Sequence, residues 1–167
     1  FPTRRSSRSR GGTKLVKPTR EQLNIRKMSV EDVPKVFDIE RNSFSHSSWS
    51  IDAFYHEIEN NEFATYFVIE FSDKIIGYVG LWLVVDQAQI TTIAISKAFR
   101  GYGLGQLLLK YAMNYARFSC DVMSLEVRID NDVAQHVYRN LGFQNGGKRK
   151  NYYGEGEDAL VMWVNLK

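Results

Sequence analysis

Three glycines at alternate positions, Gly101, Gly103 and Gly105, follow Arg100 directly after an apolar stretch rich in β-branched residues. Glycine has no Cβ, so the backbone N–H groups of such a stretch can point outward without obstruction. At the start of a helix these N–H groups and the helix dipole bind phosphate, and Arg100 adds a positive charge. The spacing therefore predicts a phosphate-binding loop; a flexible glycine turn is the alternative.

Known phosphate-loop patterns narrow the choice of ligand. A dinucleotide fingerprint requires a third glycine where Gln106 stands, and a Walker loop requires Gly-Lys followed by Ser or Thr, which this stretch lacks. A protein kinase would need a far longer chain. The pattern that is present is Arg-x-x-Gly-x-Gly, formed by Arg100, Gly103 and Gly105.

The elements that must position this loop follow from the periodicity of apolar residues. We expect strands at 23–28, 64–71, 74–84, 89–95, 122–129, 143–149 and 160–166, and helices at about 29–42, 50–60, 103–118 and 131–141. This order predicts an α/β (α+β) fold, a mixed and mostly antiparallel sheet flanked by helices.

Local signals mark the ends and faces of these helices. Residues 29–32, Ser-Val-Glu-Asp, resemble a capping box that opens the first helix, and Gly142 stands in the C-cap position of the last one. The inward face of the helix at 103–118 is predicted to consist of Leu107, Leu108, Tyr111, Ala112 and Tyr115.

Charge is divided unevenly between an N-terminal tail and the rest of the chain. Residues 1–20 contain seven Lys or Arg residues and no Asp or Glu. Removing these seven from the 22 basic residues leaves 15 against 19 acidic ones, so residues 21–167 carry a net charge of −4. We expect residues 1–22 to be a disordered basic tail and residues 23–167 to be the folded domain. A mildly acidic domain argues against binding of nucleic acid except through the tail.

Composition bounds the class of protein further. The 167 residues are 44% hydrophobic and 13% aromatic, which suits one globular domain. No run approaches the roughly 20 apolar residues of a membrane span, and no apolar signal segment follows the N-terminal arginines. The single cysteine, Cys120, excludes an internal disulfide and a multi-cysteine zinc site. We expect a soluble cytoplasmic protein with no metal and no membrane partner.

The motif Arg100-x-x-Gly103-x-Gly105 resembles the acetyl-CoA loop of the GNAT acetyltransferase superfamily. The resemblance implies that the amides of the loop hold the pyrophosphate of acetyl-CoA and that the preceding strand bonds the pantetheine through its backbone. The implied co-substrate residues are Ile93, Ala94, Ile95, Arg100, Gly101, Tyr102, Gly103, Leu104, Gly105 and Gln106, together with Asn131, for which N-capping of a helix is a compatible explanation.

Further motifs are similar, in order and spacing, to the bacterial ribosomal-protein-alanine N-acetyltransferases within that superfamily. They are residues 46–50 (His-Ser-Ser-Trp-Ser), 125–128, Asn131, Tyr138, 141–143, 148–153 and 157–159. Ser48 stands where that family usually has proline, and Thr92 where it often has asparagine. The resemblance covers about residues 23–167 and implies that His46, Trp49, Tyr152 and Tyr153 contribute to the substrate site. Core packing is the alternative for the two tyrosines, and a surface loop with a buried Trp is the alternative for Trp49 and His46.

Acetylation of an amine requires a neutral nucleophile, an oxyanion site and a proton for the departing thiolate. An α-amino group has a pKa near 8, against about 10.4 for lysine, so a weak base suffices for a protein N-terminus. The resemblance assigns the base to Glu126, acting through water, and the acid to Tyr138. The alternatives are an exposed strand carboxylate in an ion pair with Arg128 or a similar residue, and an ordinary packing tyrosine. A backbone amide near Ile95 is the expected oxyanion donor.

Three functions remain open at this point. The first is acetylation of a protein N-terminus, with the alanine of a small-subunit ribosomal protein as the substrate. The second is acetylation of a lysine or a small amine by the same fold, which a glutamate base does not exclude. The third is a non-catalytic acetyl-CoA-binding module that docks through its tail, and the presence of Glu126 and Tyr138 counts against it.

Overall fold

The computed structural model of the chain describes residues 19–44 and 49–167. Its first half contains a 3-10 turn η1 (Arg20–Gln22), β1 (Leu23–Lys27), a 3-10 turn η2 (Val30–Asp32), α1 (Val33–Ser43), α2 (Ile51–Glu59), β2 (Ala64–Phe71) and β3 (Lys74–Val84). The second half contains β4 (Gln87–Ile95), a 3-10 turn η3 (Lys97–Phe99), α3 (Leu104–Arg117), β5 (Val122–Arg128), α4 (Asp132–Asn140), β6 (Gln144–Gly154) and β7 (Glu157–Asn165).

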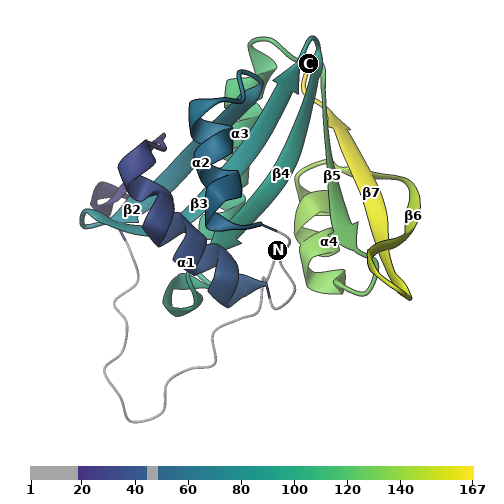
Figure 1. Cartoon of the computed structure of the whole chain (residues 1–167). Helices are drawn as coiled ribbons and strands as arrows, with labels where there is room; N and C mark the ends of the chain where they lie inside the picture. The colour runs from purple at the N-terminus through teal and green to yellow at the C-terminus, as the bar shows by residue number, and fades with distance from the viewer. Residues whose placement is uncertain (1–18, 45–48) are drawn as a thin grey trace.

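The seven strands form one sheet in the order β1-β2-β3-β4-β5-β7-β6. Every neighbouring pair is antiparallel except β4 and β5, which are parallel. The β4–β5 register comprises only Gln87–Val122, Ala88–Met123 and Gln89–Ser124, and the two strands diverge beyond it (Figure 1). The predicted mixed, mostly antiparallel sheet flanked by helices is confirmed.

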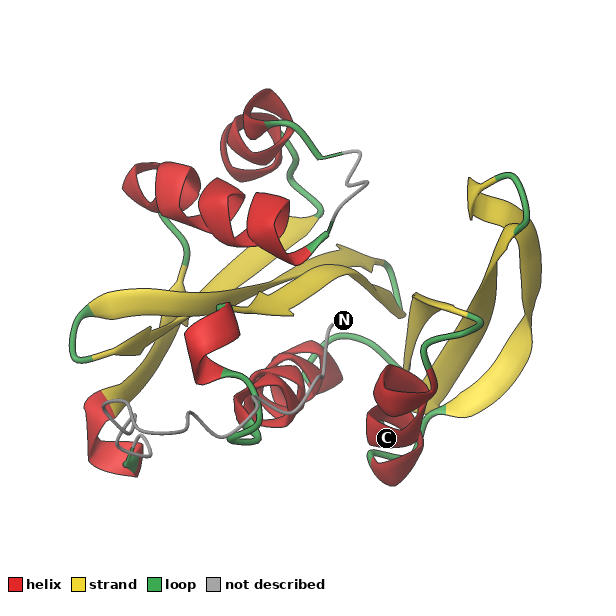
Figure 2. Cartoon of the chain, turned by 90° about the horizontal axis from the view of Figure 1, so that it is seen from below, coloured by secondary structure: helices red, strands yellow, loops and turns green. Residues whose placement is uncertain are grey.

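Helices cover both faces of the sheet (Figure 2). The core on one face includes Val36 and Ile39 of α1 and Phe54 of α2, packed on strand residues such as Tyr78. The core on the other face includes apolar residues of α3 and α4, packed on β4, β5 and β7. Alternate residues of β5 are buried on the α3 side, so that the intervening ones, Glu126 among them, lie on the opposite face.

Helix α3 is amphipathic as expected, although its buried face differs from the predicted one. Its buried residues are Leu104, Gly105, Leu108, Leu109, Ala112, Met113 and Ala116. The inward prediction was wrong for Tyr111, which is 39% exposed. Helix α3 packs over β3 and β4, and Tyr111 lies at the margin of this contact, where its ring edge still meets Phe67 at a centroid distance of 5.0 Å.

Serine side chains open both N-terminal helices. Ser29 forms the predicted capping box with Asp32, whose Oδ2 accepts a hydrogen bond from the Ser29 amide at 2.8 Å. The box begins η2, which runs directly into α1. Ser50 caps α2 by accepting a hydrogen bond from the Ala53 amide at 3.1 Å. These caps satisfy amides that a helix leaves without intrahelical partners.

Two buried carboxylates fasten these helices to the sheet. Glu40 of α1 is 2% exposed and accepts hydrogen bonds from the hydroxyls of Tyr78 on β3 and Thr92 on β4. Glu57 of α2 is 5% exposed and accepts from Tyr66 at 2.9 Å and from the indole of Trp82 at 2.6 Å. Because burying a carboxylate is costly unless it is hydrogen-bonded, these contacts fix where α1 and α2 lie over the sheet.

A short 3-10 turn is formed by the last residues of the predicted tail. Arg20–Gln22, expected in the tail, form η1, in which the side chains of Thr19 and Gln22 make a capping box before β1. Residues 1–18 lie outside the described residues, so their predicted disorder stays a prediction. Within residues 19–44 and 49–167, no helix is long and apolar enough to cross a membrane.

Candidate active site

In its second half, strand β4 is hydrogen-bonded to a neighbouring strand on one side only. Ile93, Ala94 and Ile95 are buried and pair with β3, whereas the register with β5 ends at Gln89. Beyond Gln89 the backbone edge of β4 that faces β5 is therefore outside the sheet's hydrogen-bond ladder. An extended ligand containing amides can pair with such an edge as a strand would. The predicted co-substrate residues of β4 thus lie in a suitable position.

Two residues of the glycine loop have a backbone conformation that favours glycine. Gly101 and Gly103 have φ angles of 86° and 75°, a conformation that L side chains rarely adopt. The first helical hydrogen bond of α3 runs from the Leu107 amide to the Gly103 carbonyl at 3.1 Å. This leaves the amides of residues 104–106 at the helix N-terminus for an anionic ligand.

The side chains next to these amides do not cover the backbone N–H groups that a ligand would contact. Leu104 is buried in the core with 5% exposure, and Tyr102 packs partly against the same core. A Cβ placed on Gly103 would meet no atom within 4 Å, so the approach to the loop is open at this position. The loop therefore presents backbone N–H groups rather than side chains.

Arg100 makes two hydrogen bonds within the protein that were not expected from the sequence. Its Nε donates a hydrogen bond to the Ile95 carbonyl at 2.9 Å, and its Nη2 donates to Ser43 Oγ at 3.0 Å. Burial lowers the pKa of Arg100 from its usual value, although an arginine stays charged at neutral pH. The guanidinium thus ties the end of β4 to α1 and adds positive charge beside the glycine loop.

Glu126 of β5 is held by partners that sequence patterns did not indicate. Its Oε2 accepts a hydrogen bond from Gln89 Nε2 at 3.1 Å, and its Oε1 lies 3.5 Å from Arg149 Nη2. The glutamate side chain is only 10% exposed. Arg128, the partner considered from sequence, instead forms an ion pair with Glu157 at 3.3 Å. Glu126 therefore lies, largely covered, next to the point at which β4 and β5 separate.

Tyr138 of α4 is buried in the core, with its ring 5.8 Å from that of Phe143. Burial raises the pKa of its hydroxyl above the usual value of about 10, and the neighbouring Tyr153 raises it further. The hydroxyl therefore stays protonated at neutral pH, as a proton donor must. Asn131 caps α4 by accepting a hydrogen bond from the Ala134 amide at 3.1 Å, which is the compatible role considered from sequence.

Tyr152 and Tyr153 lie close to Glu126 and pack edge-to-face, with ring centroids 5.0 Å apart. Arg128 lies over the Tyr153 ring at 4.6 Å, and Arg149 lies over the Tyr152 ring at 5.6 Å. Burial raises the pKa of Tyr153 to about 12, with smaller contributions from Tyr152 and Glu126, while Arg128 lowers it. These tyrosines and arginines form one aromatic and cationic surface beside the carboxylate.

Trp49, a further predicted substrate residue, lies against the core beneath α2. Trp49 stacks on Phe54 at 5.1 Å and contacts Tyr66 edge-on at 6.5 Å, so it packs with the aromatic residues beneath α2. His46 lies outside the described residues. A substrate role for either residue stays a prediction.

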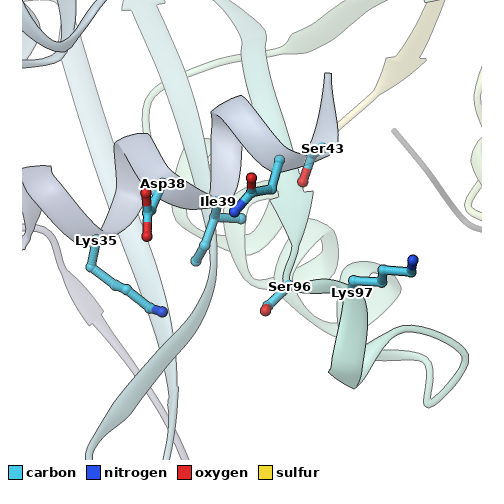
Figure 3. A pocket seen from close by; sticks show the side chains of 7 residues that line it. Lys35, Asp38, Ile39, Ser43, Ser96 and Lys97 are labelled. Carbon is cyan, nitrogen blue, oxygen red and sulfur yellow. The ribbon is translucent and has the colours of Figure 1, made fainter. Parts of the chain in front are cut away.

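A pocket that sequence patterns did not indicate lies between α1 and the turn that follows β4 (Figure 3). It borders Ser43, the residue that accepts a hydrogen bond from Arg100. The lining residues are Lys35, Asp38, Ile39, Asn42, Ser43, Ser96 and Lys97. Across the part of the chain that the structure describes, no group of three His, Cys, Asp or Glu residues could hold a metal ion.

Comparison with known proteins agrees with this fold. Residues 33–143 match the Acetyltransferase (GNAT) family, and the chain belongs to that family. Membership implies acetyl-CoA as the co-substrate, and the one-sided edge of β4 and the positive-φ glycines fit such a molecule.

Individual relatives are similar over most of their length. A Bacillus subtilis (strain 168) protein with the provisional name ribosomal protein bS18-alanine N-acetyltransferase is 46% identical over 85% of this chain and 95% of its own. The ribosomal protein bS18-alanine N-acetyltransferase of Salmonella typhimurium is 30% identical over 81% of this chain and 92% of its own. A crystal structure of the Escherichia coli ribosomal-protein-S18-alanine N-acetyltransferase superposes with a TM-score of 0.79 and 26% identity, covering 87% of this chain and 94% of that chain.

Proposed function

We propose that this enzyme transfers the acetyl group of acetyl-CoA to the N-terminal amine of a protein, the alanine of a small-subunit ribosomal protein. Relatives named as bS18-alanine N-acetyltransferases support this substrate. The observation that carries the proposal is the position of Glu126. Its carboxylate is largely covered and lies beside the point at which β4 leaves β5.

Acetyl-CoA would be held mainly by backbone groups. The amides of residues 104–106 at the N-terminus of α3 would hold the pyrophosphate, with Arg100 adding positive charge. The edge of β4 at Ile93, Ala94 and Ile95 would pair with the pantetheine, and Asn131 would add a contact from the start of α4. In this arrangement the amide near Ile95 is available as the oxyanion donor.

The chemistry would then be a direct transfer. Glu126, acting through water, takes a proton from the amine, and the neutral nitrogen forms a bond to the thioester carbonyl carbon. The nitrogen, positively charged after the attack, loses its second proton to water, the carbon–sulfur bond breaks, and the Tyr138 hydroxyl gives its proton to the departing sulfur. Proton exchange with water restores both side chains. No acyl-enzyme is required, which agrees with the burial of the single cysteine, Cys120.

The alternatives predict different substrates. An enzyme for lysine would have to deprotonate a more basic amine, since the pKa of lysine is about 10.4 against about 8 for an α-amine. A non-catalytic acetyl-CoA-binding module would have no need of a covered carboxylate beside the β4–β5 separation. A glutamate base does not by itself separate these acceptors, so the α-amine is proposed from the named relatives and from its lower pKa.

A peptide panel tests the proposal. The full chain is incubated with radiolabelled acetyl-CoA and short peptides that begin with different residues, each in a free and an N-terminally blocked form with an internal lysine. We expect acetylation of the free alanine peptide and none of its blocked form. Acetylation of the blocked peptides or of polyamines in preference to every free N-terminus would reject an α-amine substrate.

A further inference from the structure

Both oxygens of Glu126 are engaged, and the two contacts differ in kind. Gln89 is a neutral donor on β4 at 3.1 Å, in the last residue pair of the β4–β5 register. Arg149 is a cation on the edge strand β6 at 3.5 Å, and its side chain is 58% exposed. The register of β4 and β5 places Gln89 beside Glu126, whereas the contact between Arg149 and Glu126 is longer and exposed to water.

Arg149 lies between a carboxylate and an aromatic ring. It is 3.5 Å from Glu126 and 5.6 Å from the centre of the Tyr152 ring. A carboxylate and an aromatic face are also the two groups that bind an alkylammonium ion. The β6–β7 register becomes irregular directly after Arg149, which leaves this part of the edge strand without regular pairing up to Gly154.

We propose that Arg149 is a displaceable counter-ion and that the ammonium group of the substrate takes its place between Glu126 and Tyr152. The inference rests on the proposed function, with Glu126 as the base. At pH 7 most α-amino groups are protonated, because their pKa is about 8. The ammonium therefore arrives as a cation, moves the guanidinium toward water and transfers one proton to Glu126 through water. Arginine cannot make that transfer, since its pKa exceeds about 12. Gln89 holds the other oxygen throughout.

The charged and titratable groups around this place come from four strands. Glu126 and Arg128 lie on β5, Arg149 and the two tyrosines Tyr152 and Tyr153 lie on β6, and β7 supplies Glu157, which pairs with Arg128. Strand β4 contributes the uncharged Gln89. Arg149 is thus the cation in direct contact with Glu126, and its removal uncovers the carboxylate without disturbing the Arg128–Glu157 pair.

Steady-state kinetics of Arg149→Met test the proposal, because methionine keeps the apolar stem and loses the charge. With a synthetic peptide that begins with alanine, we expect KM for the peptide to fall about two- to fivefold, the range that surface ion pairs are worth. The KM for acetyl-CoA should stay unchanged, and kcat is measured alongside. Lys148→Met is the matched control: it removes the same charge from the same strand, but Lys148 pairs with Asp158 at 3.2 Å. This control should leave all three constants unchanged.

Methylguanidinium provides a second measurement. It should inhibit Arg149→Met competitively with the peptide, at a lower concentration than it inhibits the wild type, because the vacated place accepts a guanidinium. An unchanged or raised KM for the peptide in Arg149→Met, or equal inhibition of both proteins, would overturn the proposal. The wild type's acetylation of the free alanine peptide is measured alongside. If the wild type does not acetylate this peptide, the proposed function is rejected. If the wild type acetylates it and Arg149→Met has the same KM for the peptide, only the counter-ion role is rejected.

Discussion

Gln89 of β4 and Glu126 of β5 are joined by a hydrogen bond of 3.1 Å, two residues beyond the last paired position of β5, Ser124. Where the backbone ladder between the two strands ends, this side-chain contact continues it. The consequence is that the carboxylate is held at the separation of the strands by a donor that carries no charge.

Gln89→Leu should therefore impair catalysis without impairing binding. Leucine is similar in length but cannot donate a hydrogen bond, so the carboxylate loses its fixed partner. We expect kcat to fall about 2- to 13-fold, in line with the roughly 0.5–1.5 kcal/mol of an ordinary hydrogen bond, with both KM values nearly unchanged. Gln87→Leu, an exposed position on the same strand, is the control. Equal kcat values for wild type and Gln89→Leu would show that Gln89 does not position Glu126.

Substitutions at Gly103 test the phosphate loop. Asp and Asn have nearly the same size and both tolerate a positive φ better than other residues with side chains, and a Cβ at Gly103 meets no atom within 4 Å. Gly103→Asp adds a negative charge beside the phosphates, and Gly103→Asn does not. Calorimetry should show at least about a tenfold weaker acetyl-CoA affinity for Asp than for Asn, since about 1.4 kcal/mol corresponds to tenfold. Equal affinities would remove the loop's assignment to the pyrophosphate.

Glu126→Gln and Tyr138→Phe test the base and the acid. Each keeps its shape and loses the proton-transfer function, which typically supplies about 10²–10⁴-fold in rate. Both variants should bind acetyl-CoA and lose kcat. The rate of Glu126→Gln should recover as the pH rises toward the α-amino pKa of about 8, because the amine then loses its proton unaided. Tyr138→Phe should show no such recovery. Wild-type kcat for both at pH 7 would mean that positioning and the oxyanion amide suffice.

Asp32 is expected to contribute to stability in a pH-dependent way. It is 7% exposed and accepts two hydrogen bonds from Arg26, at 2.7 and 2.8 Å. This contact lowers the pKa of Asp32. Asp32→Asn should reduce the free energy of unfolding by about 1.5–3 kcal/mol at pH 7, as measured by urea denaturation.

The depressed pKa fixes the sign of the pH effect. The contribution of Asp32 is present above the unfolded-state value of about 3.9 and is lost as the pH falls through the folded-state value. Wild type and Asp32→Asn should therefore converge in strong acid. Asp38→Asn is the control, because Asp38 pairs with Arg41 on the exposed surface of α1; this change should cost less than about 1 kcal/mol. A difference between wild type and Asp32→Asn that did not depend on pH would contradict the assignment.

Local chemistry determines which elements could be predicted from the sequence. The turn at Ser72-Asp73 has positive φ angles at both residues, and the hairpin that it joins has the predicted bounds, 64–71 and 74–84. Strand β6 extends to Gly154, beyond the predicted end at 149. The prediction stopped short because β6 is an exposed edge strand without alternating apolar residues. Patterns of burial cannot reveal a strand whose residues are nearly all in water.

The partners of Glu126 could not be predicted for a different reason. Gln89 and Arg149 are long polar side chains on strands that are distant in sequence, and only the register of β4, β5, β7 and β6 brings them to the carboxylate. The same holds for Arg100, whose contact with Ser43 spans 57 residues. Glycine spacing and helix caps are local signals, whereas these contacts depend on the assembled sheet.

Competition between two nitrogens on one peptide tests the proposed function most directly. The full-length protein is incubated at pH 7 with acetyl-CoA and a peptide that carries a free N-terminal alanine and an internal lysine, and tandem mass spectrometry locates the acetyl group. We predict acetylation of the α-amine. About a tenth of α-amino groups are neutral at this pH, against fewer than about one lysine in a thousand. Acetylation of the lysine with the N-terminal amine left unmodified would contradict the account.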